Sequence, residues 1–180
     1  MKIIDSKLKD FKGGSFEVYK TEQSVTIMKF SDSKWIDNNP KYTDLFLGKC
    51  NACESFYKDS FNNFEYKSVM VAGLGFGLIP TELSEVNNLV DIDVIEINKE
   101  VIEYNILSGH LSNDINIIES DVFEYVTEKK YDLIIIDTIW CEEDMSDEQV
   151  QTLTSKFLNT NLNKGGVLYI PVKKKWLINK

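Results

Sequence analysis

The sequence predicts an α/β fold in which a doubly wound, mostly parallel sheet of about five strands follows a small N-terminal β element. From residue 68 onward, short apolar runs typical of buried parallel strands alternate with segments of helical periodicity. In the first 30 residues, by contrast, apolar and polar residues alternate, as in half-buried antiparallel strands. We therefore expect an N-terminal β-hairpin element over residues 1–41 and an α/β unit over residues 42–180, which together form one structural unit.

The N-terminal element is predicted to contain a β-hairpin. Residues 16–19 and 24–30 each alternate apolar and polar side chains, and residues 21–23 can connect them. A third short strand is expected around residues 34–37, before the turn signal of the Asn-Asn-Pro run at residues 38–40.

Apolar side chains at helical spacing predict a helix over residues 42–57. Cys50 and Cys53 fall on one face of that helix and form a Cys-x-x-Cys pair. A zinc site would need further ligands, for which Cys141 and the single His110 are the remaining candidates, so we predict no metal site. We interpret the pair as partly buried thiols, and the odd number of cysteines does not indicate a disulfide framework.

Strand and helix patterns alternate through the α/β unit, with Pro80 in the first turn of its first helix and Gly109 at the end of the second. The predicted strands cover residues 68–72, 91–97, 115–119, 131–137 and 167–172. The first predicted helix has Pro80 in its first turn and continues over residues 81–86, and the others cover residues 98–106, 122–128 and 147–158. A turn is expected at residues 164–166. The run at residues 131–137 is the most apolar, which predicts a strand in the middle of the sheet.

The chain ends soon after the last predicted strand, which leaves no room for a further strand beside it. Because an exposed strand edge promotes aggregation, we expect a contact between two copies of the chain or the N-terminal element to cover this edge. The prediction of a homodimer rests on that edge.

The composition limits the classes of partner and the location. The net charge is −9, from 20 basic and 29 acidic residues, which argues against binding to bare nucleic acid. No apolar run is long enough to span a membrane, and the first residues turn polar too early for a signal peptide. We expect a cytoplasmic protein that acts on a small molecule, without nucleic acid or membrane partners.

Three glycines at alternate positions, Gly73, Gly75 and Gly77, lie between the first predicted strand and its helix. Glycines allow a tight turn whose backbone approaches a ligand closely, and a helix N-terminus presents free N–H groups to that ligand. A dinucleotide fingerprint would require a glycine where this sequence has Leu78. The loop therefore predicts a nucleoside-bearing ligand, the alternative being a mobile turn without one.

Three acidic residues end or follow predicted parallel strands, at the edge where ligands of open α/β sheets bind. Glu96 lies about twenty residues beyond the glycines, where a carboxylate can accept hydrogen bonds from a ribose diol. Asp121 can accept a hydrogen bond from an adenine amino group, with Val122 against the ring, or can cap the helix that follows it. Asp137 ends the most apolar strand and could orient or deprotonate an amine or hydroxyl nucleophile. The alternative for Glu96 is a solvated acid at the end of a strand.

Residues 66–172 resemble the class I S-adenosylmethionine-dependent methyltransferase superfamily, and most closely its spermidine-synthase-like branch. The similar motifs are the first motif at residues 69–77 (VMVAGLGFG), the ribose motif of aminopropyltransferases at residues 94–101 (VIEINKEV), the adenine motif at residues 119–125 (ESDVFEY) and the catalytic-strand motif at residues 131–137 (YDLIIID). The resemblance implies a Rossmann-like fold, and the N-terminal element agrees with it, because spermidine synthases carry a small N-terminal β element.

The resemblance implies S-adenosylmethionine, or its decarboxylated form, as the cofactor, and it implies that Asp137 is a catalytic residue near the transferred group. The cofactor-binding residues that it implies are Gly73, Leu74, Gly75, Phe76, Gly77, Glu96, Ile97, Asp121 and Val122. The candidate substrate-binding residues are Trp35, Tyr42, Asp44, Thr138 and Trp140. Of these, Tyr42 and Asp44 belong to a Tyr-x-Asp run that is loosely similar to the Tyr-x-Glu substrate motif of spermidine synthases.

Two departures from spermidine synthases bear on the reaction. Phe76 stands where those enzymes carry an aspartate among the glycines, and residues 138–141 (TIWC) stand where they carry a Ser-Ser-Asp-Pro-like run. Because the carboxylates that would bind a polyamine are incomplete, we expect methyl transfer to a small molecule rather than aminopropyl transfer to an amine. Two further interpretations compete with it: an inactive nucleoside-binding or partner subunit, and a nicotinamide-dependent oxidoreductase, which Leu78 disfavours.

Overall fold

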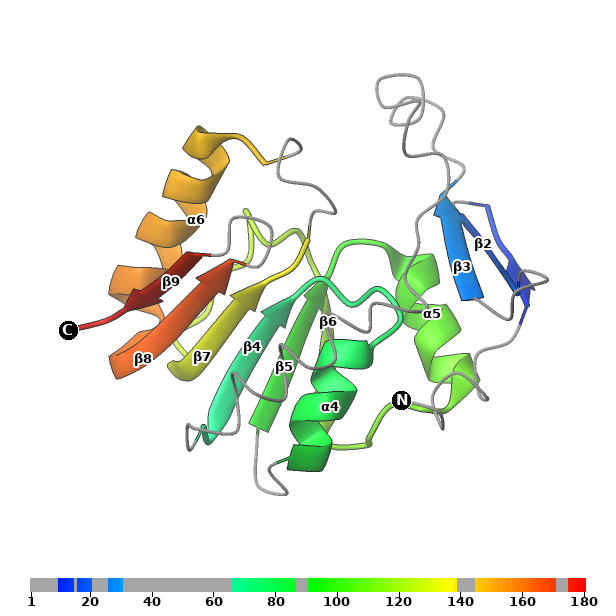
Figure 1. The fold of residues 1–180 in the computed structure, drawn as a ribbon, viewed down its shortest axis with the longest axis horizontal. Helices are drawn as coiled ribbons and strands as arrows, with labels where there is room; N and C mark the ends of the chain where they lie inside the picture. Colours follow the sequence, from blue (N-terminus) through cyan, green and yellow to red (C-terminus); the bar gives the residue numbers. More distant parts are fainter. Residues whose placement is uncertain are drawn as a thin grey trace.

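The computed structural model describes residues 10–14, 16–20, 26–30, 66–86, 91–138, 145–170 and 175–180. Figure 1 shows a central sheet with helices packed on it and a small separate sheet beside one of the helices. The third N-terminal strand expected at residues 34–37, the helix over residues 42–57 with Cys50 and Cys53, and the boundary at residue 41 lie outside the described residues.

Within the described residues, the central sheet has six strands in the order β6-β5-β4-β7-β8-β9, one more than the roughly five predicted. The strands are β4 (Ser68–Ala72), β5 (Asp91–Glu96), β6 (Ile115–Glu119), β7 (Tyr131–Ile136), β8 (Leu162–Ile170) and β9 (Lys175–Ile178). All neighbouring pairs are parallel except β8 and β9. This arrangement confirms the predicted α/β fold with a mostly parallel sheet.

The prediction about the edge of this sheet is wrong. The C-terminal strand β9 pairs with β8 in antiparallel register and covers the edge that we expected a second copy or the N-terminal element to cover. The N-terminal sheet instead lies beside α5 (Lys99–Ser108), at the other end of the molecule (Figure 1). A homodimer stays a prediction, but this edge no longer supports it.

Three helices connect the strands among the described residues: α4 (Leu78–Val86), α5 and α6 (Asp147–Thr160). Asn98 caps α5 by accepting from the N–H groups of its first turn, and Gly109 ends it in the left-handed conformation with φ 63°. Ser146 and Gln149 form a capping box at the start of α6. No helix in these ranges combines the length and apolar character needed to cross a membrane.

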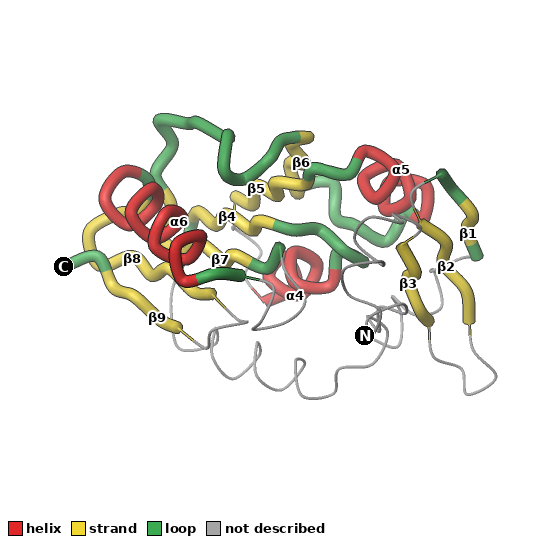
Figure 2. Tube along the Cα trace, turned by 90° about the horizontal axis from the view of Figure 1, so that it is seen from above, coloured by secondary structure: helices red, strands yellow, loops and turns green. Residues whose placement is uncertain are grey.

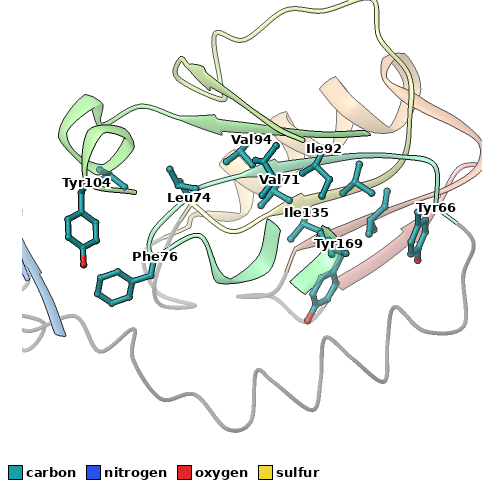
Figure 3. Packing of buried hydrophobic residues seen from close by; sticks show 14 of the residues in the cluster. Tyr66, Val71, Leu74, Phe76, Ile92, Val94, Tyr104, Ile135 and Tyr169 are labelled. Carbon is teal, nitrogen blue, oxygen red and sulfur yellow. The ribbon is translucent and has the colours of Figure 1, made fainter. Parts of the chain in front are cut away.

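The two faces of the central sheet bury different clusters, because successive residues of a strand point to opposite sides. Val69 and Val71 of β4 belong to the cluster under α4, α5 and the N-terminal sheet, part of which Figure 3 shows. Met70 and Ala72 belong to the cluster under α6. Figure 2 shows α6 near one end of the sheet and α5 near the other. The sheet is therefore covered on both faces, as expected for parallel strands.

The N-terminal sheet consists of β1 (Phe11–Lys12), β2 (Phe16–Lys20) and β3 (Thr26–Phe30), paired in the order β1-β2-β3. Strands β2 and β3 form the predicted hairpin, whereas β1 was not predicted. The buried Phe16 ring meets the Tyr104 ring of α5 edge-on at 5.9 Å. The Gly14 N–H donates to Glu100 Oε1 of the same helix over 3.2 Å. The small sheet therefore packs on α5 through aromatic and polar contacts.

The predicted helix over residues 122–128 is wrong. A single turn at residues 122–124 is followed by chain without regular structure up to β7. Residues in this segment are mostly β-branched or aromatic, and such residues have low helix propensity. The main-chain carbonyl groups of this segment instead accept hydrogen bonds from a side chain of α6 and from the residue that caps the C-terminus of α6. Lys156 Nζ donates to the Val122 and Phe123 carbonyls over 3.1 and 2.6 Å.

Asn161, the C-cap of α6, donates hydrogen bonds to the last carbonyl groups of the segment before β7. Its Nδ2 donates to the Thr127 carbonyl over 2.8 Å and to the Lys129 carbonyl over 3.1 Å. Buried carbonyls need donors, so these side-chain bonds allow the chain to reach β7 without a helix. Tertiary contacts with α6 therefore decide the conformation of residues 122–130.

The turn expected at residues 164–166 lies inside strand β8. The register between β7 and β8 shifts between Tyr131 and Leu133, opposite these glycines. Gly165 has φ 81°, and its N–H donates to the Asn179 carbonyl over 2.7 Å. The two glycines therefore form an irregularity within β8 rather than a turn before it.

A buried carboxylate ties three strands and the chain before β7 together. Asp93 of β5 is buried and accepts from Tyr131 Oη and Lys129 Nζ, each over 2.7 Å, and from Asn116 Nδ2 over 2.8 Å. Burial alone would raise the pKa of Asp93, but the three hydrogen bonds and the Lys129 charge together hold it below its ordinary value. This charge is fully partnered, so we assign it a structural role.

Candidate functional site

The glycine loop, residues 73–77, lies between β4 and α4 at the carboxyl ends of the central strands. Gly73, Gly75 and Gly77 have φ values of 97°, 50° and 68°, which side chains other than glycine rarely adopt. The Gly73 N–H donates to the Ile95 carbonyl over 2.8 Å. A Cβ on Gly73 would clash with the carbonyl oxygen of Asp137 at the end of β7. The glycines therefore let the loop pass close to the ends of β5 and β7.

Glu96, the last residue of β5, holds the start of this loop through a hydrogen bond. Its Oε2 accepts from the Leu74 N–H over 2.9 Å, and its Oε1 accepts from the Asn98 N–H over 2.8 Å. An ionised carboxylate has about four acceptor positions, so two remain for the hydroxyls of a ribose diol. Glu96 thus lies where the sequence predicted it, beside the glycines, and it also orders the loop.

Asp121 follows β6, and the Ser120 N–H donates to the Glu96 carbonyl over 3.0 Å, which brings the two acidic positions together. Asp121 Oδ1 accepts from the Phe123 N–H over 2.8 Å. The residue therefore has the capping role that was the alternative to adenine binding, although it caps a turn and not a helix. Its second carboxylate oxygen has no hydrogen-bond partner among the described residues. Asp121 can therefore cap this turn and still accept a bond from a ligand.

Two apolar residues that were predicted to bind the cofactor differ sharply in exposure. Ile97, directly after Glu96, is 66% exposed, which is unusual for a large aliphatic side chain. Val122 is 5% exposed and packs in the cluster under α6. Ile97 can therefore cover a flat apolar ligand, whereas Val122 has little side-chain surface left for one.

Asp137 follows β7, and its N–H donates to the Ala72 carbonyl over 2.8 Å. The residue is exposed, yet the protein around its carboxyl group desolvates it and raises its pKa to about 6. Beside it, the Thr138 Oγ1 is buried and has no hydrogen-bond partner in the described part of the chain. The remaining candidate substrate-binding residues, Trp35, Tyr42, Asp44 and Trp140, lie outside the described residues.

The side chains of Leu74 and Phe76 point into the protein rather than into the site. Phe76 is 2% exposed, and its ring centroid lies 6.2 Å from that of Tyr104. Figure 3 shows the two rings next to each other. Leu74 is buried in the same cluster. Both residues can therefore meet a cofactor only through main-chain atoms.

Two residues that touch the glycine loop were not predicted. Asn105 of α5 donates from Nδ2 to the Gly75 carbonyl over 2.7 Å, and His110 Nε2 lies 2.8 Å from the Phe76 carbonyl. Asn105 is buried beside Val101 and Tyr104 on the inner face of α5. In the sequence, the feature that could have identified Asn105 is its position as a polar residue on the apolar face of the helix. The described residues contain no group of three or more His, Cys, Asp or Glu side chains that could hold a metal ion.

No protein-family model matches the sequence, and no curated protein matches it at a significant level, whereas many solved structures match the fold. One is a Staphylococcus aureus protein assigned as a caffeoyl-CoA O-methyltransferase, with 19% identity, a TM-score of 0.54, and coverage of 77% of this chain and 63% of that one. Another is the glycopeptide N-methyltransferase MtfA complexed with S-adenosylmethionine, with 11% identity, a TM-score of 0.53, and coverage of 64% and 52%.

A third is coclaurine N-methyltransferase bound to N-methylheliamine and S-adenosylhomocysteine, with 16% identity, a TM-score of 0.53, and coverage of 66% and 34%. The chain thus spans between about a third and two thirds of the length of these three structures. At these identities the likeness concerns the fold alone. The chain has the Rossmann-like fold of class I S-adenosylmethionine-dependent methyltransferases.

Proposed function

We propose that this chain binds S-adenosylmethionine and takes part in transfer of its methyl group to a small-molecule acceptor. The observation that carries the proposal is the convergence of the glycine loop, Glu96, Asp121 and Asp137 at the carboxyl edge of four adjacent strands. Such an edge is where ligands of open α/β sheets bind. The methyltransferase structures that share this fold support the same assignment.

The residues at this edge fit an adenosyl ligand. Glu96 keeps two acceptor positions for the ribose hydroxyls, and Asp121 keeps one carboxylate oxygen for the adenine amino group. The exposed Ile97 lies directly after Glu96 and can pack against the adenine ring. Val122 contributes through its main chain, because its side chain is buried.

S-adenosylmethionine would supply an electrophilic methyl carbon, so the protein has mainly to align the acceptor and to accept its proton. Asp137 is the candidate for both tasks. With a pKa of about 6, its carboxylate is largely ionised at neutral pH and still basic enough to take part in proton transfer. The buried Thr138 hydroxyl beside it can hydrogen-bond the acceptor.

The spermidine-synthase-like assignment and aminopropyl transfer to an amine remain the alternative chemistry. The motif around Glu96 supports it, whereas the buried Phe76 ring speaks against it, since no carboxylate extends from the glycine loop at that position. A subunit that binds the nucleoside without catalysis is the second alternative. Ligand binding and turnover together separate the three.

The binding test is isothermal titration calorimetry with S-adenosylmethionine, its decarboxylated form, S-adenosylhomocysteine, methylthioadenosine and NAD. We expect S-adenosylmethionine and S-adenosylhomocysteine to bind, and Glu96→Ala to weaken both about tenfold or more, the size of a lost charged hydrogen bond. The matched control is Glu103→Ala, which removes an exposed carboxylate of α5 that pairs with Lys99. Preference for the decarboxylated compound would favour aminopropyl transfer, and failure of every adenosyl compound to bind would overturn the proposal.

If the adenosyl compounds bind, release of S-adenosylhomocysteine in the presence of hydroxyl and amine acceptors tests catalysis. Product formation that Asp137→Asn abolishes would support methyl transfer. Binding without turnover on any acceptor would favour the non-catalytic alternative.

A further inference from the structure

We infer that Asn105, with His110, is a positioning residue that sets the conformation of the glycine loop for ligand binding. The inference rests on the proposed function and adds to the site two residues that belong to none of the sequence motifs. Asn105 lies in the last turn of α5, and His110 lies just beyond its C-cap. Both reach the loop from the same side.

Helix α5 is linked to the glycine loop near both of its own ends, through Glu96 at its start and directly at its end. At its start, Asn98 caps the helix and donates its N–H to Glu96, whose other oxygen accepts from Leu74 at the start of the loop. At its end, Asn105 and His110 contact the carbonyl groups of the loop's middle. The position of α5 therefore fixes both the Glu96 carboxylate at the end of β5 and the carbonyl groups in the middle of the loop.

The orientation of the Asn105 amide follows from its partners. Nδ2 lies 2.7 Å from the Gly75 carbonyl and 2.8 Å from the Val101 carbonyl, and both carbonyls can only accept, so the nitrogen must face them. The amide oxygen, Oδ1, is buried and has no hydrogen-bond partner within the described ranges. A buried unpaired oxygen lowers stability, so stability alone does not explain this side chain. Its two donated bonds order a loop that we assign to ligand binding.

His110 adds a second contact one peptide further along. Its Nε2 lies 2.8 Å from the Phe76 carbonyl, which can only accept, so Nε2 must carry a proton. The packing here is close, because a Cβ on Gly77 would lie 3.0 Å from Asn105 Oδ1 and 3.2 Å from His110 Nε2. Gly77 therefore allows both side chains to approach the loop.

These contacts orient two successive peptide groups. In a trans peptide the N–H points opposite to the carbonyl, so turning the Gly75 and Phe76 carbonyls toward α5 turns the next two N–H groups away from it. The Gly77 N–H bonds to the Leu74 carbonyl over 2.7 Å within the loop. The Phe76 N–H has no acceptor among the described residues. We assign this N–H to the ligand, in a loop whose glycines have positive φ and can form an anion-binding or dipole-binding turn.

The experiment compares Asn105→Leu with Asn161→Leu. The two asparagines are a matched pair, since each is buried and each donates from Nδ2 to two main-chain carbonyls. Asn161 serves residues 127–129, away from the glycine loop. S-adenosylhomocysteine binding is measured by calorimetry, and folding by circular dichroism and thermal unfolding. We expect about a tenfold increase in Kd for Asn105→Leu and less than about a twofold change for Asn161→Leu.

His110→Ala provides a second variant in case Asn105→Leu does not fold, because His110 lies outside the helix and meets the loop through its Nε2. It should raise the Kd several-fold, whereas Ser112→Ala, in the exposed loop beyond it, should leave the Kd unchanged. If the unaltered chain binds S-adenosylhomocysteine and both loop-contacting variants bind equally well, the inference is overturned while the proposed function stands. If the unaltered chain does not bind it, the proposed function fails, and the inference fails with it.

Discussion

The main-chain N–H of Leu74 donates to the Glu96 carboxylate over 2.9 Å, which joins the start of the glycine loop to the end of β5. Because the second oxygen of the same group accepts from Asn98, one side chain connects the loop, a strand and the cap of α5. A residue expected only to contact a ligand therefore also organises the site before any ligand binds.

Glu96→Gln tests this double role. Leu74 and Asn98 donate to different carboxylate oxygens, and glutamine replaces one of these oxygens with an NH2 group that can only donate, so one of the two bonds is lost. We expect a loss of about 1–2 kcal/mol in the free energy of unfolding. Urea denaturation measures this loss, and calorimetry measures the accompanying decrease in S-adenosylhomocysteine affinity. Glu103→Gln, at an exposed position of α5, should change neither quantity appreciably. An unaltered stability for Glu96→Gln would contradict the organising role.

Gly73→Ala should disturb the site more than its backbone angle explains. The new Cβ would clash with the Asp137 carbonyl oxygen, so the end of β7 must move or the loop must open. We expect a loss of about 3 kcal/mol or more in the free energy of unfolding. Gly109→Ala is the control, because Gly109 also has a positive φ but a Cβ there meets no neighbour among the described residues, and it should cost about 1 kcal/mol. If both variants lost the same free energy of unfolding, the contact with the Asp137 carbonyl would add nothing to the cost of the backbone angle, and the prediction would be wrong.

The raised pKa of Asp137 predicts a distinct pH dependence of stability. Since its pKa of about 6 in the folded protein exceeds its ordinary value of 3.8, the folded state favours the protonated form. The destabilisation by the charged form therefore develops as pH rises from about 4 to 7. Asp137→Asn, which stays neutral, should raise the Tm relative to the unaltered protein at about pH 8 and raise it less at about pH 4. Thermal unfolding across this range measures the difference, and a Tm difference independent of pH would rule out the raised pKa.

Asp93 should show the opposite behaviour. Its pKa is held below 3.8 in the folded protein, so its charge stabilises the fold above that pH, and this stabilisation is lost as pH falls through the lowered pKa. At neutral pH, Asp93→Asn should lower the free energy of unfolding by about 2 kcal/mol, because the bonds from Lys129 and Tyr131 lose their charged acceptor.

Urea denaturation at about pH 7 and about pH 3 measures both effects of Asp93→Asn. Asp91→Asn is its control, since Asp91 is exposed and pairs with the same lysine at 2.8 Å. An exposed pair contributes little, so this variant should stay within about 0.5 kcal/mol of the unaltered protein. If both variants behaved alike, the buried network would not be the source of the effect.

Local patterns were sufficient to predict most of the alternating elements of the α/β unit. The strand at Ile115–Glu119 and the end of α5 at Gly109 lie where the sequence placed them. The reason is that strand burial, helix capping and glycine at positive φ depend on residues that are neighbours in the chain. The acidic residues at the carboxyl edge follow from the same logic, because parallel strands bring their ends to one edge.

Contacts between distant segments decided the rest. Residues 122–130 form no helix because Lys156 and Asn161, in α6 and at its end, supply the donors that their carbonyl groups need. Strand β9 covers the edge of β8 because the irregularity at Gly165 and its bond to Asn179 allow the last residues to pair with that strand.

The α/β fold, the glycine loop and the acidic residues at its edge could be predicted from the chain alone, because each depends on short-range periodicity and on residue type. Two features emerged only in the folded chain: Phe76 packs against Tyr104 instead of facing the site, and Asn105 reaches the Gly75 carbonyl 30 positions earlier in the chain. Both outcomes depend on where α5 packs against the loop. No local pattern encodes that position, since it follows from burying the two faces of the sheet together.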